Sequence, residues 1–342
     1  MRENYDVQAS EKLKKVQKTL QYYVEKVEWF PAVSREFYRN RADFWYDPHM
    51  QLGFRRKDDR FKGLSVPHCQ LVSTGAQALY SHLEKLLPEK KIPPYSVLEQ
   101  KGYLRYVIIR ESKNPSKRIV SFVTFSLENE SIMHEIANEI LQKKLATGVV
   151  WIHHPSFNDT VDGTIHHTWG EPLLTETLNG IPFTYNASCF FQTNPAMAEK
   201  LQEWVIHHVP DRSRVLDLYC GVGILSIPLA LRGHLIHGVE MNNESIIFAR
   251  KNAHALGIDE DAFSFAAGDV PKYLQELEKQ NEKWETIILD PPRSGLSKKI
   301  WRRLLRLEPQ TFIYVSCQRD ALLRDLEWLE EYAEFKIENA AA

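Results

Sequence analysis

The stretch Asp217-Leu-Tyr-Cys-Gly221-Val-Gly223 decides the fold, because it closes one apolar segment and opens another with a different period. Residues 213–219 (SRVLDLY) predict a strand, and residues 224–232 (ILSIPLALR) predict a helix. The two glycines allow a tight turn and let the backbone approach a ligand at the start of the helix. The sequence therefore predicts a strand–loop–helix unit that carries a ligand-binding loop.

Four more units of this kind follow along the chain. The predicted strands cover 234–240, 263–269, 285–290 and 311–317, and the predicted helices cover 243–256, 270–281, 297–306 and 319–331. Such alternation is typical of an α/β fold with an open, doubly wound parallel sheet. Ligands of these sheets bind at the carboxyl ends of the strands.

The chain before this region has a mixed pattern. Helices are predicted at 9–27, 74–88 and 131–144, and strands at 103–109 and 118–127. This order of elements indicates an α+β domain. Because 342 residues are about twice the usual domain length, we expect one domain at 1–184 and the α/β domain at 185–342.

Composition excludes several classes of protein. The hydrophobic fraction is 43% and the net charge is −2, which fits a globular protein and argues against a globally basic nucleic-acid binder. Four cysteines cannot form a disulfide scaffold, so we expect a reduced, cytoplasmic setting. The charged start, MRENYDVQASEKLKKVQ, predicts no signal peptide. No stretch approaches the ~20 apolar residues that span a membrane.

The small net charge hides an uneven distribution. Residues 1–144 carry 25 Lys and Arg against 18 Asp and Glu, a net charge of +7. Residues 145–342 carry 18 against 27, a net charge of −9. The basic first part therefore remains compatible with a polyanionic partner.

Acidic residues at the strand ends point to the kind of ligand. Glu240 ends the second strand, 17 residues after Gly223, where a carboxylate suits a ribose. Asp269 ends the third strand, where we expect a contact with an adenine edge. The loop lacks the third glycine of the dinucleotide fingerprint, and Asp217 disfavours a pyrophosphate. This favours the sulfonium of S-adenosylmethionine over a dehydrogenase cofactor, the alternative being that the loop has no ligand.

Two further motifs follow the fourth and fifth strands. In Asp290-Pro291-Pro292-Arg293-Ser294-Gly295 the prolines stiffen a loop at the ligand edge. Cys317 ends the fifth strand, just ahead of a predicted helix. Cysteine is often only a buried apolar residue, but a thiol before a helix N-terminus ionises more readily.

These motifs resemble the RNA (uracil-5-)-methyltransferase family, which makes 5-methyluridine in tRNA and 23S rRNA. The resemblance is carried by DLYCGVG, by DPPRSG, by YVSC (314–317) and by FFQTN (190–194). It extends to YRNR (38–41), LGFR (52–55) and VPHC (66–69). It implies a Rossmann-like S-adenosylmethionine-dependent methyltransferase domain after an α+β, RNA-binding central domain.

The resemblance also implies roles for single residues. S-adenosylmethionine would be contacted by Gln192, Tyr219, Glu240, Asp269 and Asp290. Cys317 would be the nucleophile that adds to carbon 6 of the target uracil, which turns carbon 5 into a nucleophile. The target uridine would be unstacked and brought into the pocket.

The sequence departs from the family pattern in three places. The family carries its proposed catalytic Glu after the last helix, whereas this sequence stops at KIENAAA, and Glu334 and Glu338 do not sit in that motif. We therefore expect the general base and the last strand of the sheet to be missing. Of the family's iron–sulfur cysteines only Cys69 matches, and one thiolate cannot hold a four-iron four-sulfur cluster. Gln318-Arg319 stands where the family has Asn-Pro, and Ile224 replaces a polar residue.

RNA is the partner we expect, with no membrane and a monomeric chain. Arginines among the aromatic residues of 29–60 are candidate phosphate contacts: Arg39, Arg41, Arg55 and Arg56. The alternative is a solvated face over an aromatic core. The histidine pairs 153–154 and 166–167 predict a solvated hairpin or polar loop rather than a metal site.

Two functions therefore stay open besides an unrelated methyltransferase. One is transfer of a methyl group to carbon 5 of a uridine in tRNA or 23S rRNA through a Cys317–uridine adduct. The other is a binding-only homologue that docks RNA and cofactor without turnover. A methyltransferase acting on adenine or protein is disfavoured, because Arg293 stands where those enzymes carry an aromatic residue after Pro-Pro.

Overall fold

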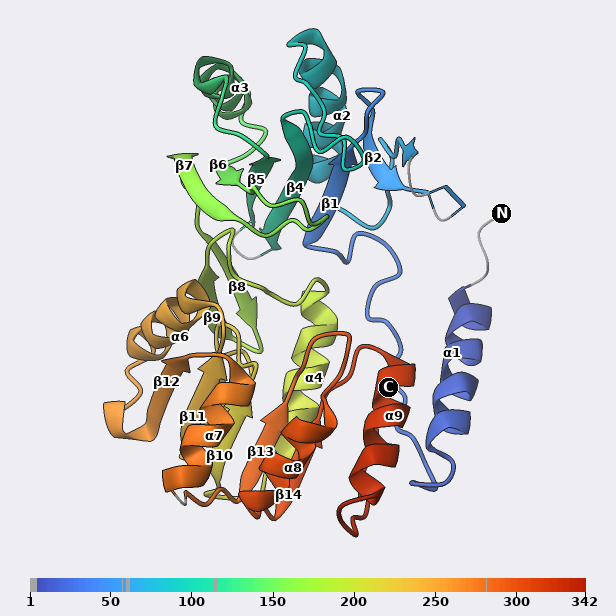
Figure 1. Cartoon of the computed structure of the whole chain (residues 1–342), viewed down its shortest axis with the longest axis vertical. Helices are drawn as coiled ribbons and strands as arrows, with labels where there is room; N and C mark the ends of the chain where they lie inside the picture. Colours follow the sequence, from blue (N-terminus) through green and yellow to red (C-terminus); the bar gives the residue numbers. More distant parts are fainter. Residues whose placement is uncertain (1–4, 57, 60–61, 114–115, 281) are drawn as a thin grey trace. The chain divides into compact units, whose positions relative to one another are not determined.

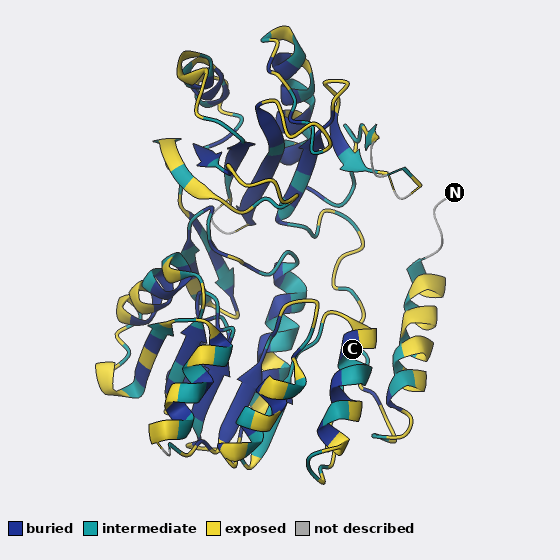
Figure 2. Ribbon diagram, in the orientation of Figure 1, coloured by how far each residue is buried: buried dark blue, intermediate teal, exposed yellow. Residues whose placement is uncertain are grey.

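The computed structural model describes residues 5–56, 58–59, 62–113, 116–280 and 282–342. The chain divides into two compact units, one of Glu36–Ala196 and one of Met1–Arg35 with Met197–Ala342. Figure 1 labels their elements, and Figure 2 shows buried strands beneath helices whose outer faces are exposed. Within the described ranges, none of the helices has the length and apolar character needed to cross a bilayer.

The unit of Met197–Ala342 is built on a five-stranded parallel sheet. Its order is β12-β11-β10-β13-β14. The strands are β10 (Arg214–Leu218), β11 (Leu235–Glu240), β12 (Phe263–Ala267), β13 (Thr286–Leu289) and β14 (Thr311–Tyr314). The order steps outward in both directions from β10, which confirms the doubly wound, Rossmann-like α/β fold. Among the described residues β14 forms one edge of the sheet.

The helices next to these strands in the chain are α4 (Pro195–His208), α5 (Ser226–Ala230), α6 (Asn243–Ala255), the 3-10 turn η1 (Glu260–Ala262), α7 (Val270–Gln280), α8 (Lys298–Arg306) and α9 (Arg319–Glu330). Helices α5 to α9 follow these strands at nearly the predicted positions, whereas α4, before β10, and the 3-10 turn η1 were not predicted. Asn242 and Ser297 cap α6 and α8 by accepting backbone hydrogen bonds. One core cluster joins β10 and β13 to α7 and α8, with Trp301 among its fully buried side chains.

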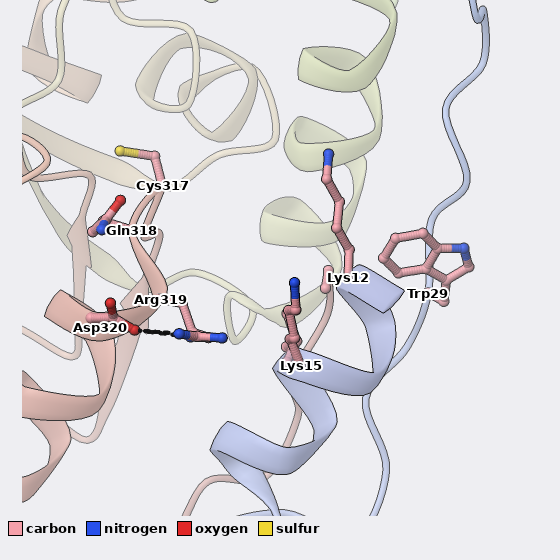
Figure 3. Close-up of a pocket in the computed structure, with 9 residues that line it drawn as sticks. Lys12, Lys15, Trp29, Cys317, Gln318, Arg319 and Asp320 are labelled. Carbon is pink, nitrogen blue, oxygen red and sulfur yellow. Dashed lines mark hydrogen bonds and ion pairs between the residues drawn. The ribbon is translucent and has the colours of Figure 1, made fainter. Parts of the chain in front are cut away.

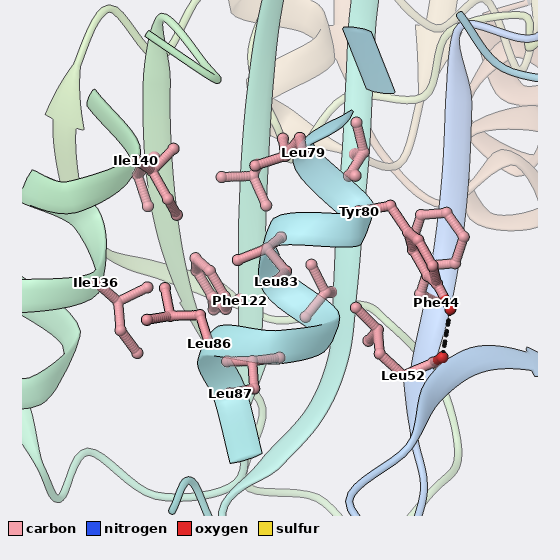
Figure 4. Packing of buried hydrophobic residues seen from close by; sticks show 14 of the residues in the cluster. Phe44, Leu52, Leu79, Tyr80, Leu83, Leu86, Leu87, Phe122, Ile136 and Ile140 are labelled. Atoms are coloured by element: carbon pink, nitrogen blue, oxygen red, sulfur yellow. Dashed lines mark hydrogen bonds between the residues drawn. The ribbon is translucent and has the colours of Figure 1, made fainter. Parts of the chain in front are cut away.

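The unit of Glu36–Ala196 is the expected α+β part. Its seven-stranded sheet has the order β3-β2-β1-β4-β5-β6-β7, and a separate hairpin pairs β8 with β9. The elements are β1 (Arg41–Tyr46), β2 (Leu52–Arg55), β3 (Gly63–Leu64), α2 (Thr74–Glu89), β4 (Leu104–Lys113), β5 (Ser116–Thr124), α3 (Glu130–Gln142), β6 (Gly148–His153), β7 (Thr164–Gly170), β8 (Leu174–Leu178) and β9 (Ile181–Tyr185). Figure 4 shows α2 and α3 packing leucines and isoleucines against aromatic residues of the sheet.

The first helix groups differently from what the sequence predicts. We expected residues 1–35 in a first domain that ends at 184, whereas they group with Met197–Ala342. Helix α1 (Tyr5–Leu20) packs its apolar stripe on α9, with Leu20 and Leu326 in one cluster. Beyond α1, the backbone of Glu28 pairs with that of Ala340 and Ala342. A pairing between residues about 300 apart in sequence cannot be deduced from the periodicity of either segment.

Candidate active site

The loop after β10 makes a sharp turn through three residues with left-handed backbone. Tyr219, Gly221 and Gly223 have φ angles of 67°, 55° and 87°. A side chain at Gly223 would also press on Ile227 at 3.0 Å, whereas Gly221 faces open space. Tyr219 pays roughly 1–2 kcal/mol for this conformation because it has a Cβ, and its amide donates to the Val239 carbonyl at 2.8 Å. The glycines are therefore required by the turn, as the sequence predicts.

Four predicted cofactor residues lie at the carboxyl edge of the sheet. Glu240 ends β11, and its carboxylate accepts hydrogen bonds from the amides of Gly221 at 3.3 Å and Asn242 at 2.8 Å. Asp269, exposed before α7, accepts one from the Lys272 amide at 3.2 Å. Tyr219 and Asp290 follow β10 and β13, respectively. The edge thus gathers three carboxylates around the glycine loop.

Asp217 is the most buried acidic side chain of this edge. It is 1% exposed, and Ser226 donates its hydroxyl to one carboxylate oxygen at 2.5 Å. Burial raises the pKa of Asp217 to about 7, and the nearby charges of Asp290 and Glu240 act in the same direction. Burial also raises the pKa of Asp290 to about 6.

These carboxylates repel each other, and the site has one unsatisfied atom. The second oxygen of Asp217 is buried without a hydrogen-bond partner among the described residues. A ligand with positive charge favours the ionised carboxylates and so offsets their mutual repulsion. The acidic residues at this edge are therefore chemically suited to a cationic cofactor such as S-adenosylmethionine, and the ribose contact of Glu240 stays a prediction.

The structure adds Asp325, which the sequence analysis missed. This residue of α9 is fully buried and accepts hydrogen bonds from the Leu296 amide at 2.7 Å and the Tyr314 hydroxyl at 2.5 Å. Arg324 donates to the other Asp325 oxygen at 2.6 Å and to the Ser294 carbonyl at 2.6 Å. Asp325 thus joins the DPPRSG loop, β14 and α9.

A sequence signal for Asp325 exists, although it is weak. On α9 it lies four residues after buried Ala321 and four before buried Leu329, so the helical period places it on the inner face. The nearby Gly295 is also explained, because a Cβ there would lie 2.5 Å from an Asp325 oxygen. The residue therefore holds the loop by direct contact.

Cys317 is the exposed thiol among the four cysteines, none of which is in a disulfide. It lies two residues before α9 begins, as predicted, but the strand β14 ends at Tyr314, three residues earlier than the predicted end at Cys317. It lines a pocket of about 540 Å³ together with Lys12, Lys15, Trp29, Gln318, Arg319 and Asp320 (Figure 3). Burial raises the pKa of the Cys220 thiol well above its ordinary value. Cys317 is therefore the thiol best placed to meet a large substrate.

The predicted phosphate-binding arginines lie in the unit of Glu36–Ala196. Arg41, Arg55 and Arg56 are ion-paired at 2.7, 2.6 and 2.5 Å with Asp43, Asp159 and Asp58, respectively. A phosphate would have to compete with these carboxylates, so their role stays a prediction.

The other predicted residues of this unit are Arg39, Gln192, the histidine pairs and Cys69. The buried Nε of Arg39 has no partner among the described residues. Gln192 accepts a hydrogen bond at its carbonyl from Asn40 at 3.0 Å. His153, His166 and His167 belong to the antiparallel pair β6 and β7, as expected for a hairpin, whereas His154 follows β6 and is buried rather than solvated. The described part of the chain contains no group of three or more side chains placed to hold a metal ion, and Cys69 packs against the core.

Comparison with known proteins identifies the class and then the family. The doubly wound fold, with its glycine turn after β10 and the carboxylates at the strand ends, defines an S-adenosylmethionine-dependent methyltransferase. Residues 173–342 match the family model of tRNA (uracil-5-)-methyltransferase. The tRNA (uracil(54)-C(5))-methyltransferase of Pyrococcus horikoshii is 30% identical over 99% of this chain and 77% of its own length. The chain therefore belongs to this family.

Two further comparisons agree. The crystal structure of the Pyrococcus abyssi tRNA (uracil-54, C5)-methyltransferase with S-adenosyl-L-homocysteine is similar, with a TM-score of 0.77 and 28% identity. The similarity covers 96% of this chain and 77% of that one. The 23S rRNA (uracil(747)-C(5))-methyltransferase of Vibrio cholerae is 28% identical over 91% of this chain and 84% of its own length.

Proposed function

We propose that the chain transfers a methyl group from S-adenosylmethionine to carbon 5 of a uridine in RNA, with Cys317 as the nucleophile. The observation that carries the proposal is the exposed Cys317 thiol beside a pocket, at the same sheet edge as the acidic cofactor residues. Relatives named for tRNA and for 23S rRNA both support RNA as the substrate class. A cytoplasmic, monomeric protein belongs to the same proposal.

The chemistry explains why a thiol is needed. Carbon 5 of uracil is too weak a nucleophile to take a methyl group unaided. The Cys317 thiolate adds to carbon 6, and the electron pair of the carbon 5–carbon 6 double bond becomes available at carbon 5. After methylation a base removes the proton from carbon 5, the double bond re-forms and the carbon 6–sulfur bond breaks. S-adenosylmethionine supplies the electrophilic methyl group.

The residues of the sheet edge have separate tasks in this proposal. Glu240 holds the ribose hydroxyls, and Asp269 contacts the adenine edge. Tyr219 and Asp290 line the cofactor, and the charge of Asp217 balances its cationic part. Gln192 belongs to the unit of Glu36–Ala196, and its cofactor contact stays what the resemblance implies.

The experiment follows labelled methyl groups into RNA. The protein is incubated with methyl-labelled S-adenosylmethionine and either bulk tRNA or 23S rRNA, and the digested nucleosides are separated. We expect the label in 5-methyluridine with the native protein and with Cys69→Ala, and no label with Cys317→Ala. Cys69→Ala is the matched control, because it removes a half-buried thiol that does not line the pocket.

A denaturing gel of protein, RNA and cofactor separates the two functions left open by the sequence. A shifted band that Cys317→Ala abolishes, together with 5-methyluridine, supports turnover through the adduct. The same band without 5-methyluridine identifies a binding-only protein that traps RNA. If neither the shifted band nor a label on carbon 5 of uridine is observed, the proposal is overturned.

A further inference from the structure

Helix α1 is fixed beside the nucleophile by its apolar face. Val16 and Leu20 of α1 pack in a cluster with Leu322 and Leu326 of α9. Because α9 begins two residues after Cys317, this packing brings one edge of α1 to the nucleophile's pocket. The helix is therefore part of the wall of that pocket.

Two lysines of α1 project from this edge. Lys12 and Lys15 are three residues apart, which places them on the same side of the helix, and both line the pocket that contains Cys317. In Figure 3 both lysine side chains extend from α1 in roughly the same direction, with the Cys317 segment on the other side of the view. Both are exposed, and neither ammonium group has an ion pair within the described ranges.

The wall of the pocket that Lys12 and Lys15 form is therefore positively charged. The third cation, Arg319, is ion-paired with Asp320 at 2.7 Å, so these two charges offset each other. Lys12 and Lys15 line the same pocket as Cys317 without an ion pair among the described residues, and Val16 and Ala342 complete the lining. Trp29 adds a half-buried aromatic ring to the same pocket. Unpaired cations next to an aromatic ring match the phosphates and bases of single-stranded RNA.

We propose that Lys12 and Lys15 bind the RNA phosphates next to the uridine attacked by Cys317, while Trp29 stacks on a neighbouring base. This inference rests on the proposed function, because it takes Cys317 to mark the position of the target nucleotide. It makes α1 a substrate-binding element in addition to the arginines of the other unit. When the target uridine is unstacked, the neighbouring bases separate from it, and proteins bind such bases by stacking aromatic rings on them.

The test compares two double variants of the same helix. Lys12→Gln with Lys15→Gln removes the pocket charges, and Lys14→Gln with Lys18→Gln removes two exposed lysines outside the pocket. RNA affinity is measured by fluorescence anisotropy with labelled tRNA, without cofactor, at several salt concentrations. We expect the pocket variant to bind about tenfold more weakly, as two partly exposed charge contacts predict. Its salt slope should fall by about 1 for each lysine, and the control should change much less.

Trp29→Leu supplies a second, independent variant. It keeps an apolar side chain but removes the stacking surface, so we expect RNA affinity to fall several-fold with the salt slope unchanged. Far-ultraviolet circular dichroism checks that each variant keeps its helices.

The outcomes separate this inference from the proposed function. Equal loss of affinity in both lysine variants, or unchanged affinity in the pocket variant, overturns the inference even if 5-methyluridine forms. A native protein that makes no 5-methyluridine counts against the proposed function, whereas a selective loss of affinity in the pocket variant still supports a binding site for RNA.

Discussion

The Tyr314 hydroxyl donates a hydrogen bond to the fully buried Asp325 carboxylate at 2.5 Å, which ties the end of β14 to α9. Cys317 lies between these two residues in the chain, so the bond closes a short loop that carries the proposed nucleophile. The same carboxylate oxygen accepts the Leu296 amide at 2.7 Å. Asp325 thus links the DPPRSG loop to the end of β14, three residues before Cys317.

We predict that Asp325→Asn weakens both folding and catalysis. The amide of Asn turns a donor toward either the Leu296 amide or the Arg324 guanidinium, which leaves donors facing donors. The free energy of unfolding should fall by about 1–3 kcal/mol, the usual penalty for an unsatisfied buried group. Urea unfolding measures this, and kcat at saturating RNA should fall while cofactor affinity changes less.

Two variants make this prediction specific. Glu327→Gln changes an exposed carboxylate of the same helix and should stay within about 0.5 kcal/mol of the native protein. Tyr314→Phe removes one donor, and its effect should be non-additive with Asp325→Asn by at least about 0.5 kcal/mol. Additive effects would show that the two side chains do not act together.

The parallel sheet was predictable because its strands are buried on both faces. Residues 286–289 (TIIL) are a nearly continuous apolar run, and residues 214–218 (RVLDL) are mostly buried and lead into the glycine turn. The strand ends then brought Glu240, Asp269 and Asp290 to one edge by topology alone. Sequence reasoning succeeded where local period and chain order determine position.

Sequence reasoning failed where contacts between distant parts of the chain determine the position of a residue. The period of α1 predicts a helix, but not that its apolar stripe packs on α9 beside Cys317. The charge of Asp325 gives no sign of its burial, since the hydrogen-bond donors that satisfy it come from residues 296 and 314. The helix itself ends at Leu20 rather than at residue 27.

The buried Asp217 predicts a pH-dependent stability. Its folded pKa of about 7 lies above the unfolded value of about 3.9, so the folded protein holds a proton that the unfolded chain has lost. Stability therefore falls as pH rises from about 4 to about 7, by an amount of order 4 kcal/mol. Asp217→Asn removes this pH-dependent loss of stability. The free energy of unfolding of the variant should therefore rise relative to that of the native protein as pH increases from about 4 to about 7.

Urea unfolding at several pH values checks the prediction for Asp217. Glu276→Gln, which changes an exposed carboxylate on α7, is the control and should follow the native curve. Parallel curves for Asp217→Asn and the native protein would contradict a raised pKa at this position.

Gly238 of β11 is predicted to be intolerant of any side chain. A Cβ there would lie 2.4 Å from the Phe265 ring and 2.9 Å from the Cys220 sulfur, both of which are buried. Gly238→Ala should lower the free energy of unfolding by about 1–3 kcal/mol through overpacking. Because Cys220 belongs to the glycine loop, cofactor affinity should fall as well.

Gly268→Ala is the matched control, since its Cβ would meet only the Tyr273 ring at 3.4 Å. Phe265→Leu shortens the clashing side chain and should partly rescue Gly238→Ala. No rescue by Phe265→Leu would assign the defect to something other than this contact.

The acidic edge predicts that cofactor binding strengthens as pH rises. The pKa of Asp290 is about 6 because burial disfavours its charge, and a bound cation restores that charge. S-adenosylmethionine therefore favours the ionised carboxylates, and its affinity should rise from pH 5 to about pH 8 with release of protons on binding. Titration calorimetry in two buffers of different ionisation enthalpy measures that release. S-adenosylhomocysteine, which lacks the sulfonium charge, should show a smaller pH effect. Asp290→Asn should reduce the pH dependence of the affinity for both ligands. An affinity for S-adenosylmethionine that does not change with pH in the native protein would mean that these carboxylates do not respond to the charge of the ligand.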